Sequence, residues 1–333
     1  MTMVQEPART DIVDLGEKAI GDRAISAIVD RRREIAEGIV ELVFRAADDG
    51  DLPRWEPGAH VDIVLDDGEI RQYSLCGDPA DRTTFTVAVL LEKEGRGGSR
   101  RIHEELRAGT SVELRGPRNH FPLHESQRYL FIAGGIGVTP LIPMMRAVEA
   151  AGAEWRFVYG GRSESTMGYV DDLRELGDRV TIWPEDVNGL IDLDGLLGTA
   201  TKETLVYSCG PEPLLAAVEE RCQSWPQGTL NIERFTAIQI DTSADTGFEV
   251  ELAQTGITVH VPEDRTILEV VNEAGVYVPT SCTEGTCGSC ETPILDGTAE
   301  HRDVVLSPDE QDAQETMMIC VSRASCPRLV LDL

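Results

Sequence analysis

Positive charge is scarce in this 333-residue chain. It contains 30 Lys and Arg against 59 Asp and Glu, a formal net charge of −29. Nucleic acids and anionic membranes bind basic surfaces, so the composition argues against either as a partner. The deficit is uneven, because residues 241–333 carry 18 acidic residues, four arginines and no lysine. An acidic face in this part of the chain would suit a basic partner protein.

Long hydrophobic runs and histidine clusters are also missing. The most apolar stretch, residues 129–145, is broken by glycines and two prolines and is slightly short for a membrane span. The first residues are acidic and contain no apolar leader segment, so we expect a cytoplasmic protein. The six histidines are scattered along the chain. Their spacing predicts neither a Rieske histidine pair nor a mononuclear iron site.

Cysteines, in contrast, are crowded into one short stretch. Three of the eight lie within nine residues, in SCTEGTCGSC, at Cys282, Cys287 and Cys290, and Cys320 follows at a distance. The C-x4-C-x2-C spacing with one distant cysteine is that of plant-type [2Fe-2S] sites. Glycines at 285 and 288 allow the loop to curl, so that backbone N–H groups can face the sulfurs.

Two other interpretations of these cysteines remain open. A zinc site usually pairs two C-x2-C knuckles, and only Cys287 and Cys290 form one here. Buried, unreactive thiols are the second alternative, which we expect for Cys326 and Cys222. We favour the iron–sulfur cluster.

The periodicity of the chain divides it into three parts. Short strand patterns with period two predict an antiparallel barrel in the first part, with one helix; they lie at 39–46, 60–65, 72–77, 85–93 and 111–117, and the helix at 99–109. Alternating strands and helices predict a parallel sheet in the second part; strands are expected at 128–134, 154–161, 179–186 and 204–210, and helices at 139–152, 169–177 and 211–225. In the last part a hairpin, a helix and a final strand are expected; they lie at 248–253, 257–263, 266–275 and 328–333.

Two stretches in the first part suggest a phosphate site. One is RQYSL, residues 71–75, on a strand pattern; the other is GRGGS, residues 95–99, which leads into the predicted helix. Glycine-rich turns at helix N-termini bind anions through free N–H groups and the helix dipole. Alone, either stretch could equally be an ordinary strand or a flexible loop.

Two stretches in the second part suggest a dinucleotide site. The stretch AGGIGVTP, residues 133–140, follows a predicted strand and opens a helix, as a dinucleotide-binding turn requires. It has Pro140 at the last position of the motif, where proline suits the first helical turn. The stretch SCGPEP, residues 208–213, follows another predicted strand.

Together these motifs resemble the phthalate dioxygenase reductase branch of the ferredoxin–NADP reductase superfamily. RQYSL resembles the flavin-binding R-x-Y-S motif, AGGIGVTP the G-x-G-x-x-P turn, and SCGPEP the C-G-P turn. The resemblance covers nearly the whole chain after about residue 22. It implies a multidomain fold: an antiparallel β-barrel for the flavin, an α/β parallel-sheet nucleotide domain and an α+β (β-grasp) ferredoxin domain.

The resemblance also implies the domain boundaries. We expect a flexible N-terminal extension over 1–21, an FMN-binding barrel over 22–124 and an NAD-binding domain over 125–232. A linker over 233–246 then leads to the ferredoxin domain over 247–333.

Residue roles follow from the same resemblance. Arg71 pairs with the flavin phosphate, Tyr73 packs on the flavin and Ser74 bonds near the atom that accepts hydride. Cys209 lies beside the reacting carbon of the nicotinamide. Further flavin contacts are expected from Val87, Ala88, Gly97, Gly98, Ser99 and Phe235. Nucleotide contacts are expected from Gly135, Gly137, Thr139, Cys209 and Gly210. Cluster ligands are expected at Cys282, Cys287, Cys290 and Cys320.

The implied function is a relay of electrons. NADH supplies hydride to FMN, and the [2Fe-2S] cluster passes single electrons to a terminal oxygenase. The favoured oxygenase is a Rieske-type aromatic hydroxylase or O-demethylase. FAD in place of FMN and NADPH in place of NADH are the less favoured cofactors; Arg162 would suit a 2′-phosphate and Glu164 would repel one. The oxygen chemistry then belongs to the partner, and a monomer is expected.

Three alternatives stay open at this point. The same relay could serve a cytochrome P450 or another haem oxygenase. The chain could be a ferredoxin-bearing regulatory protein without turnover, or a flavin reductase that releases reduced FMN.

Overall fold

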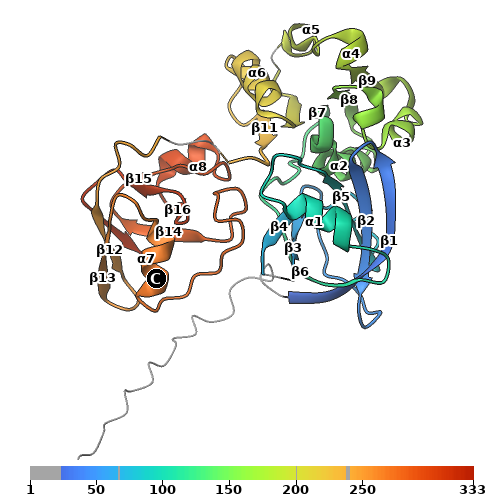
Figure 1. Ribbon diagram of the computed structural model, residues 1–333. Coiled ribbons are helices and arrows are strands. Elements are labelled where there is room, and N and C mark those ends of the chain that lie inside the picture. Colours follow the sequence, from blue (N-terminus) through green and yellow to red (C-terminus); the bar gives the residue numbers. More distant parts are fainter. Residues whose placement is uncertain (1–23, 67, 200, 238–240) are drawn as a thin grey trace, which may run out of the picture. The chain divides into compact units, whose positions relative to one another are not determined.

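The computed structural model describes residues 24–66, 68–199, 201–237 and 241–333. These residues fall into two compact units, with the division after Ala237. The first unit contains an antiparallel barrel and a parallel sheet, and the second contains a smaller mixed sheet (Figure 1). The predicted fold class is confirmed. The predicted N-terminal extension over 1–21 lies outside the described residues.

The barrel is a six-stranded sheet in the order β4-β3-β6-β1-β2-β5. Backbone N–H of Cys76 donates to the carbonyl of Thr86 at 2.9 Å, which links the end of β4 to β5 and helps to close the barrel. Alternate side chains face a core that includes Phe44, Val61 and Phe85. The elements are β1 Ala24–Ala36, β2 Ile39–Ala46, β3 His60–Val64, β4 Ile70–Ser74, β5 Thr84–Leu90, α1 Gly98–Glu105 and β6 Ser111–Arg118.

Strand β1 was not among the predicted strands. Its sequence contains Asp-Arg-Arg-Arg-Glu, which masks the alternation of period two. Only Ala27 and Val29 of this strand are buried in the barrel core. Pairing with both β2 and β6 stabilises the strand where its own pattern is weak.

The parallel sheet has the order β11-β10-β7-β8-β9. From β7 the chain continues to β8 and β9 on one side of the sheet, and later to β10 and β11 on the other side. The strand order therefore reverses between β7 and β10. In open α/β sheets, ligands bind outside the carboxyl ends of the strands at the point of reversal. The elements are β7 Arg128–Gly134, α2 Val138–Ala150, β8 Glu154–Gly161, α3 Val170–Arg174, β9 Val180–Pro184, α4 Glu185–Asn188, α5 Leu193–Leu197, β10 Thr204–Cys209, α6 Glu212–Cys222 and β11 Leu230–Glu233.

The helix predicted over 169–177 is shorter in the structure. Both flanks adopt left-handed backbone conformations, at Tyr169 with φ 64° and at Gly177 with φ 74°. Helix α3 therefore occupies only the five residues between Val170 and Arg174. Helices α4 and α5, between β9 and β10, were not predicted, because each is too short to show a helical period.

The second unit is a mixed sheet in the order β13-β12-β18-β14-β16, with β12 and β18 parallel. Helix α7 packs Ile267, Leu268 and Val271 into its core. The elements are β12 Phe248–Leu252, β13 Ile257–Val261, α7 Ile267–Glu273, β14 Glu291–Asp296, β15 Ala299–Glu300, α8 Pro308–Ala313, β16 Thr316–Met318, β17 Arg323–Ala324 and β18 Arg328–Leu331. Among the described residues, no helix combines the length and the hydropathy needed to cross a membrane.

The chain between β11 and β12 is held at both of its ends. Next to β11, the guanidinium of Arg234 pairs with Glu212 at 2.9 Å and Glu219 at 2.6 Å. Next to β12, the carboxylate of Asp245 pairs with Arg302 at 2.6 Å and Arg323 at 3.4 Å. Each unit therefore binds its own end of the linker.

Candidate functional site

The turns after β7 and β10 meet at the point where the strand order of the parallel sheet reverses. A Cβ atom at Gly137 would collide with the carbonyl oxygen of Cys209, and one at Gly134 would come within 2.6 Å of Pro211 Cδ. Gly135 has φ 54°, in the left-handed region that glycine adopts readily. The glycines therefore allow the two backbones to touch, and no larger residue fits at Gly137.

All five predicted nucleotide residues are gathered at these turns. Gly135 and Gly137 form the turn, and buried Thr139 lies in the first turn of α2, where its hydroxyl donates to the carbonyl of Ile136 at 2.9 Å. Cys209 and Gly210 face them from the end of β10. The turn also lies against β5 of the barrel, the strand that carries Val87 and Ala88. A nucleotide bound here would reach the barrel.

Glu233 lies beside Cys209, and the sequence analysis did not assign it a role. It is the last residue of β11 and is the register partner of Cys209 in the parallel pair. The two side chains approach to 3.9 Å between Sγ and Oε2. Burial raises the pKa of Glu233 to about 8, and burial together with this carboxyl group raises the pKa of the Cys209 thiol. At neutral pH the pair is therefore a thiol next to a protonated carboxyl group, not an activated nucleophile.

A candidate phosphate cradle lies at the N-terminus of α1, where Arg71 is paired with Glu69. Gly97 precedes the helix as its N-cap with φ 97°, and a Cβ at Gly98 would collide with the guanidinium of Arg71. Arg71, on β4, is therefore packed directly against the free N–H groups of the helix. Ser99 is buried and accepts a bond from Glu92 N at 3.0 Å, which closes the loop from β5. A fork-shaped guanidinium at a helix N-terminus fits a phosphate.

The remaining predicted flavin residues lie on neighbouring elements. Ser74 ends β4 and is buried, and Tyr73 packs against the barrel core, where burial raises its pKa. Val87 and Ala88 are buried on β5. Phe235 follows β11 and is 43% exposed, so its ring has an uncovered face. Strands β4 and β5 contact each other, and α1 contacts both strands.

The four predicted cluster cysteines come together in the second unit. The sulfur of Cys282 interacts with those of Cys287 and Cys320, and Cys290 interacts with Cys320. Backbone N–H groups of Glu284 and Thr286 donate to the Cys282 sulfur at 3.3 and 3.4 Å. Contact with Cys282, together with burial, raises the pKa of the Cys287 thiol.

This donor set fits a [2Fe-2S] cluster. The loop contains left-handed residues at Thr283, Gly285 and Gly288, and these turns direct its N–H groups at sulfur. Within the part of the chain that the structure describes, no group of three or more His, Cys, Asp or Glu side chains is arranged to hold a single metal ion. The sequence has one C-x2-C pair, whereas a structural zinc site usually has two, so the spacing favours two irons. Cys326 is separate and interacts with the carbonyl of Arg328.

Comparisons with known proteins agree with both sites. Residues 250–325 match the family model of the 2Fe-2S iron–sulfur cluster binding domain, and residues 131–220 match that of the oxidoreductase NAD-binding domain. The phthalate 4,5-dioxygenase oxygenase reductase subunit of Pseudomonas putida is 38% identical over 91% of this chain and 94% of its own length. The vanillate O-demethylase oxidoreductase of the same species is 36% identical over 93% and 100%.

The chain belongs to the phthalate dioxygenase reductase branch of the ferredoxin–NADP reductase superfamily. The solved phthalate dioxygenase reductase superposes with a TM-score of 0.69 at 35% identity, over 93% of this chain and 98% of that one. An intact type IV self-sufficient cytochrome P450 monooxygenase gives a TM-score of 0.88 at 43% identity, over 96% of this chain. This chain spans 43% of the length of that P450 protein.

Membership of the reductase branch makes the chain an NADH-dependent flavin and iron–sulfur oxidoreductase. The two residues considered for nucleotide choice lie near the end of β8. Glu164 is engaged with Arg174, and the carbonyl of Arg162 accepts from Asp186 N at 3.1 Å. This hydrogen bond joins the chain after β9 to the chain after β8.

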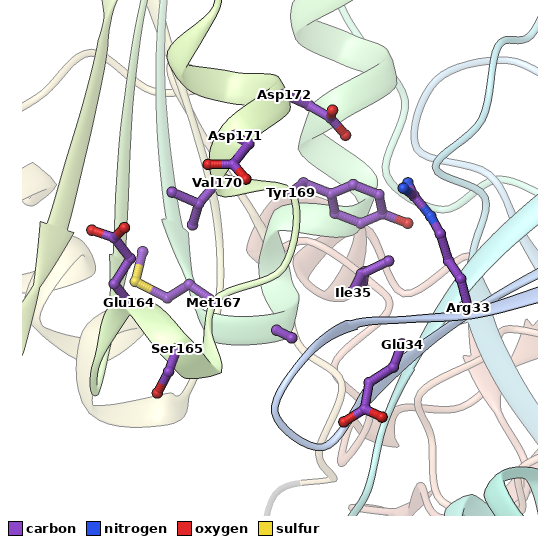
Figure 2. Close-up of a pocket in the computed structure, with 11 residues that line it drawn as sticks. Arg33, Glu34, Ile35, Glu164, Ser165, Met167, Tyr169, Val170, Asp171 and Asp172 are labelled. Carbon is purple, nitrogen blue, oxygen red and sulfur yellow. The ribbon is translucent and has the colours of Figure 1, made fainter.

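A cavity of about 560 Å³ lies in this reductase between the end of β1 and the segment that leads into α3 (Figure 2). Glu164, considered above for the choice of nucleotide, lines it, and the predicted flavin and cluster residues do not. The hydroxyl of Tyr169, which borders it, lies 3.3 Å from the sulfur of Cys76, two residues beyond Ser74. Tyr169 thus connects the nucleotide-binding half to the chain that follows the flavin motif.

Proposed function

We propose that this chain is the reductase component of a multicomponent oxygenase, which takes electrons from NADH through FMN and a [2Fe-2S] cluster to a terminal oxygenase. The observation that carries the proposal is the meeting of the β7 and β10 turns against β5 of the barrel. This meeting supports transfer from a nucleotide at the turns to a flavin at β5, within one unit. When bound, the flavin accepts an electron pair as hydride and the cluster carries one electron at a time.

The chain's own residues would position these groups. Arg71 and the N-terminus of α1 would hold the terminal phosphate of FMN, and Ser74 would bond to the isoalloxazine edge. Cys209, held as a neutral thiol beside protonated Glu233, would pack against the nicotinamide without acting as a nucleophile. Cys282, Cys287, Cys290 and Cys320 would bind the irons. The preference for NADH rests on the relatives of the reductase branch.

The first candidate partner is a Rieske-type aromatic hydroxylase or O-demethylase. Its support is the pair of relatives named for phthalate dioxygenase and vanillate O-demethylase systems, at 38% and 36% identity. The second candidate is a haem oxygenase, supported by the 43% identity to the self-sufficient P450 protein. In either case the acidic character of residues 241–333 suits a partner with a basic docking face.

Reconstitution of the relay provides the test. The purified chain, loaded with FMN and cluster, is titrated anaerobically with NADH, and reduction of cytochrome c serves as the one-electron assay. We expect Cys282→Ser to retain flavin bleaching by NADH and to lose most cytochrome c reduction. Cys326→Ser is the matched control and is expected to retain both, since this thiol lies outside the ligand set.

Each outcome separates one alternative. Cytochrome c reduction that survives Cys282→Ser would refute the relay through the cluster. Activity that depends on added free FMN would favour a flavin reductase, and no NADH oxidation by the loaded protein would favour a regulatory role. Extraction of the bound flavin distinguishes FMN from FAD. Addition of a purified Rieske oxygenase or a P450 in parallel distinguishes the two partner classes by coupled substrate oxidation.

A further inference from the structure

The segment His301–Leu306, between β15 and α8, contacts both cysteine-bearing parts of the second unit. Backbone N–H of Val304 donates to the carbonyl of Gly285, in the three-cysteine loop, at 3.0 Å. Backbone N–H of Arg302 donates to the hydroxyl of Ser322, two residues after Cys320, at 3.1 Å. We call His301–Leu306 the bracing segment, because it joins the loop that carries three ligands to the loop that carries the fourth.

The contact at Gly285 is close on both sides. Gly285 has φ 70°, and a Cβ there would lie 2.6 Å from Val321 Cγ2 and 3.1 Å from the Cα of Asp303. The three-cysteine loop is therefore packed between the Cys320 loop and the backbone of Asp303. A displacement of Asp303 would be transmitted to both sets of ligands.

The carboxylate of Asp303 fixes this arrangement from the inside. Asp303 is 3% exposed, and its Oδ2 accepts from the N–H groups of Val305 and Leu306 at 3.2 and 2.8 Å. Its Oδ1 accepts from the hydroxyl of Ser322, itself 1% exposed, at 3.3 Å. One buried side chain thus holds both its own turn and the Cys320 loop.

Among the described ion pairs, this carboxylate is joined to no arginine or lysine side chain. The neighbouring guanidinium, Arg302, is directed to Asp245 at 2.6 and 2.9 Å and to Glu300. The nearest ring nitrogen, Nδ1 of buried His301, lies 3.9 Å from Asp303 Oδ1, beyond hydrogen-bond distance. A buried carboxylate held mainly by neutral donors opposes the addition of an electron to a group beside it.

We infer that Asp303 is a positioning residue of the iron–sulfur site, which holds the three-cysteine loop and the Cys320 loop together and lowers the reduction potential of the cluster. The inference rests on the proposed ligand set. It does not require the proposed partner or the NADH reaction, since the potential is a property of the second unit alone.

The test is the midpoint potential of the cluster in the full-length, cofactor-loaded protein, by redox titration with EPR detection. Asp303→Asn keeps the volume of the side chain and removes its charge. We expect reduction of the cluster to become more favourable on the order of tenfold, which is a positive shift of about 59 mV for one electron. Asp312→Asn removes the same charge from an exposed position on α8 and is expected to leave the potential unchanged.

A second variant distinguishes the positioning role of Asp303 from the effect of its charge on the cluster. Ser322→Ala keeps the carboxylate but removes the hydroxyl between Arg302 and Asp303. We expect its cluster to be released to a chelator several-fold faster than in the parent protein, with a smaller change in potential than in Asp303→Asn. If Asp303→Asn does not retain a cluster, the rate of cluster release from Ser322→Ala still tests the positioning role of Asp303.

Two results would overturn the inference. One is a fully loaded Asp303→Asn protein whose potential equals that of Asp312→Asn. The other is a Ser322→Ala protein that releases its cluster at the parent rate. Failure of the proposed relay would instead leave the shift in potential intact and abolish only NADH-driven reduction.

Discussion

Replacement of Glu233 by glutamine is expected to remove a pH dependence from the stability of the unit that contains the nucleotide turns. The side chain lies 3.9 Å from the Cys209 sulfur, and burial raises its pKa from the ordinary 4.5 to about 8. Between these two values the folded protein keeps the proton while the unfolded chain loses it. The free energy of unfolding therefore falls as the pH rises through this window, and falls no further above the folded value.

The size of the effect follows from the shift in pKa. Each unit is equivalent to about 1.36 kcal/mol, so the full shift corresponds to about 5 kcal/mol lost between pH 4.5 and 8. Because Glu233 is only half-buried by solvent accessibility, about 2–3 kcal/mol is the expected observable loss. Glutamine has the same shape and no proton to lose, so the variant should be less sensitive to pH.

The assay is thermal or urea unfolding of both proteins at pH 5, 6, 7, 8 and 9, followed by tryptophan fluorescence. We expect the advantage of Glu233→Gln over the parent to grow with pH up to about 8 and then level off. NADH-driven flavin reduction near pH 7 should differ little between the two, because the parent carboxyl group is protonated there. Unfolding curves that stay parallel from pH 5 to 9 would refute the buried, protonated carboxyl group.

Three further substitutions test other parts of the structure. Gly137→Ala should weaken NADH affinity at least tenfold in steady-state kinetics, because its Cβ meets the Cys209 carbonyl. A Cβ at Gly135 meets no atom within 4 Å, so Gly135→Ala should show only the strain of its left-handed backbone, about 1 kcal/mol. Equal losses of affinity in the two variants would contradict the role given to the contact between Gly137 and Cys209. Arg71→Ala should lower the ratio of bound flavin to protein on purification, whereas Arg31→Ala, with its side chain 75% exposed, should not. Asp62→Ala should lower the stability of the barrel by about 3–5 kcal/mol in urea unfolding, because it removes the buried carboxylate that pairs with Arg118 at 2.6 Å. Glu154→Gln, at the exposed pair with Arg128, should cost less than about 1 kcal/mol.

The local motifs were the part of the site that the sequence could predict. Strand 128–134 and the glycine turn after it were predicted correctly, because a buried apolar run followed by glycines has a local signature. The cysteine loop was predicted from the spacing of its cysteines, and pairwise interactions link the side chains of Cys282, Cys287, Cys290 and Cys320.

Functional neighbours that are distant in the chain could not be predicted in the same way. Glu233 joins Cys209 only because β11 lies parallel to β10, and Tyr169 reaches Cys76 across 93 positions. Asp303 sits in a segment without hydrophobic period, and its partners become visible only once the two cysteine loops are folded. Side chains of this kind acquire a role from tertiary packing, which no local pattern encodes.

The ion pairs at the two ends of the linker bear on how the reductase responds to salt. The Arg234 and Arg302 side chains are 17% and 7% exposed, and ions screen such pairs far less than they screen surface charges. The length of chain between the two ion pairs is therefore nearly independent of ionic strength. The local concentration of one unit around the other, which this length sets, should be nearly independent of ionic strength as well. Under the proposed function, delivery of electrons to a separate protein through an acidic surface would weaken as salt is added, whereas the covalent tether between the two units would not change.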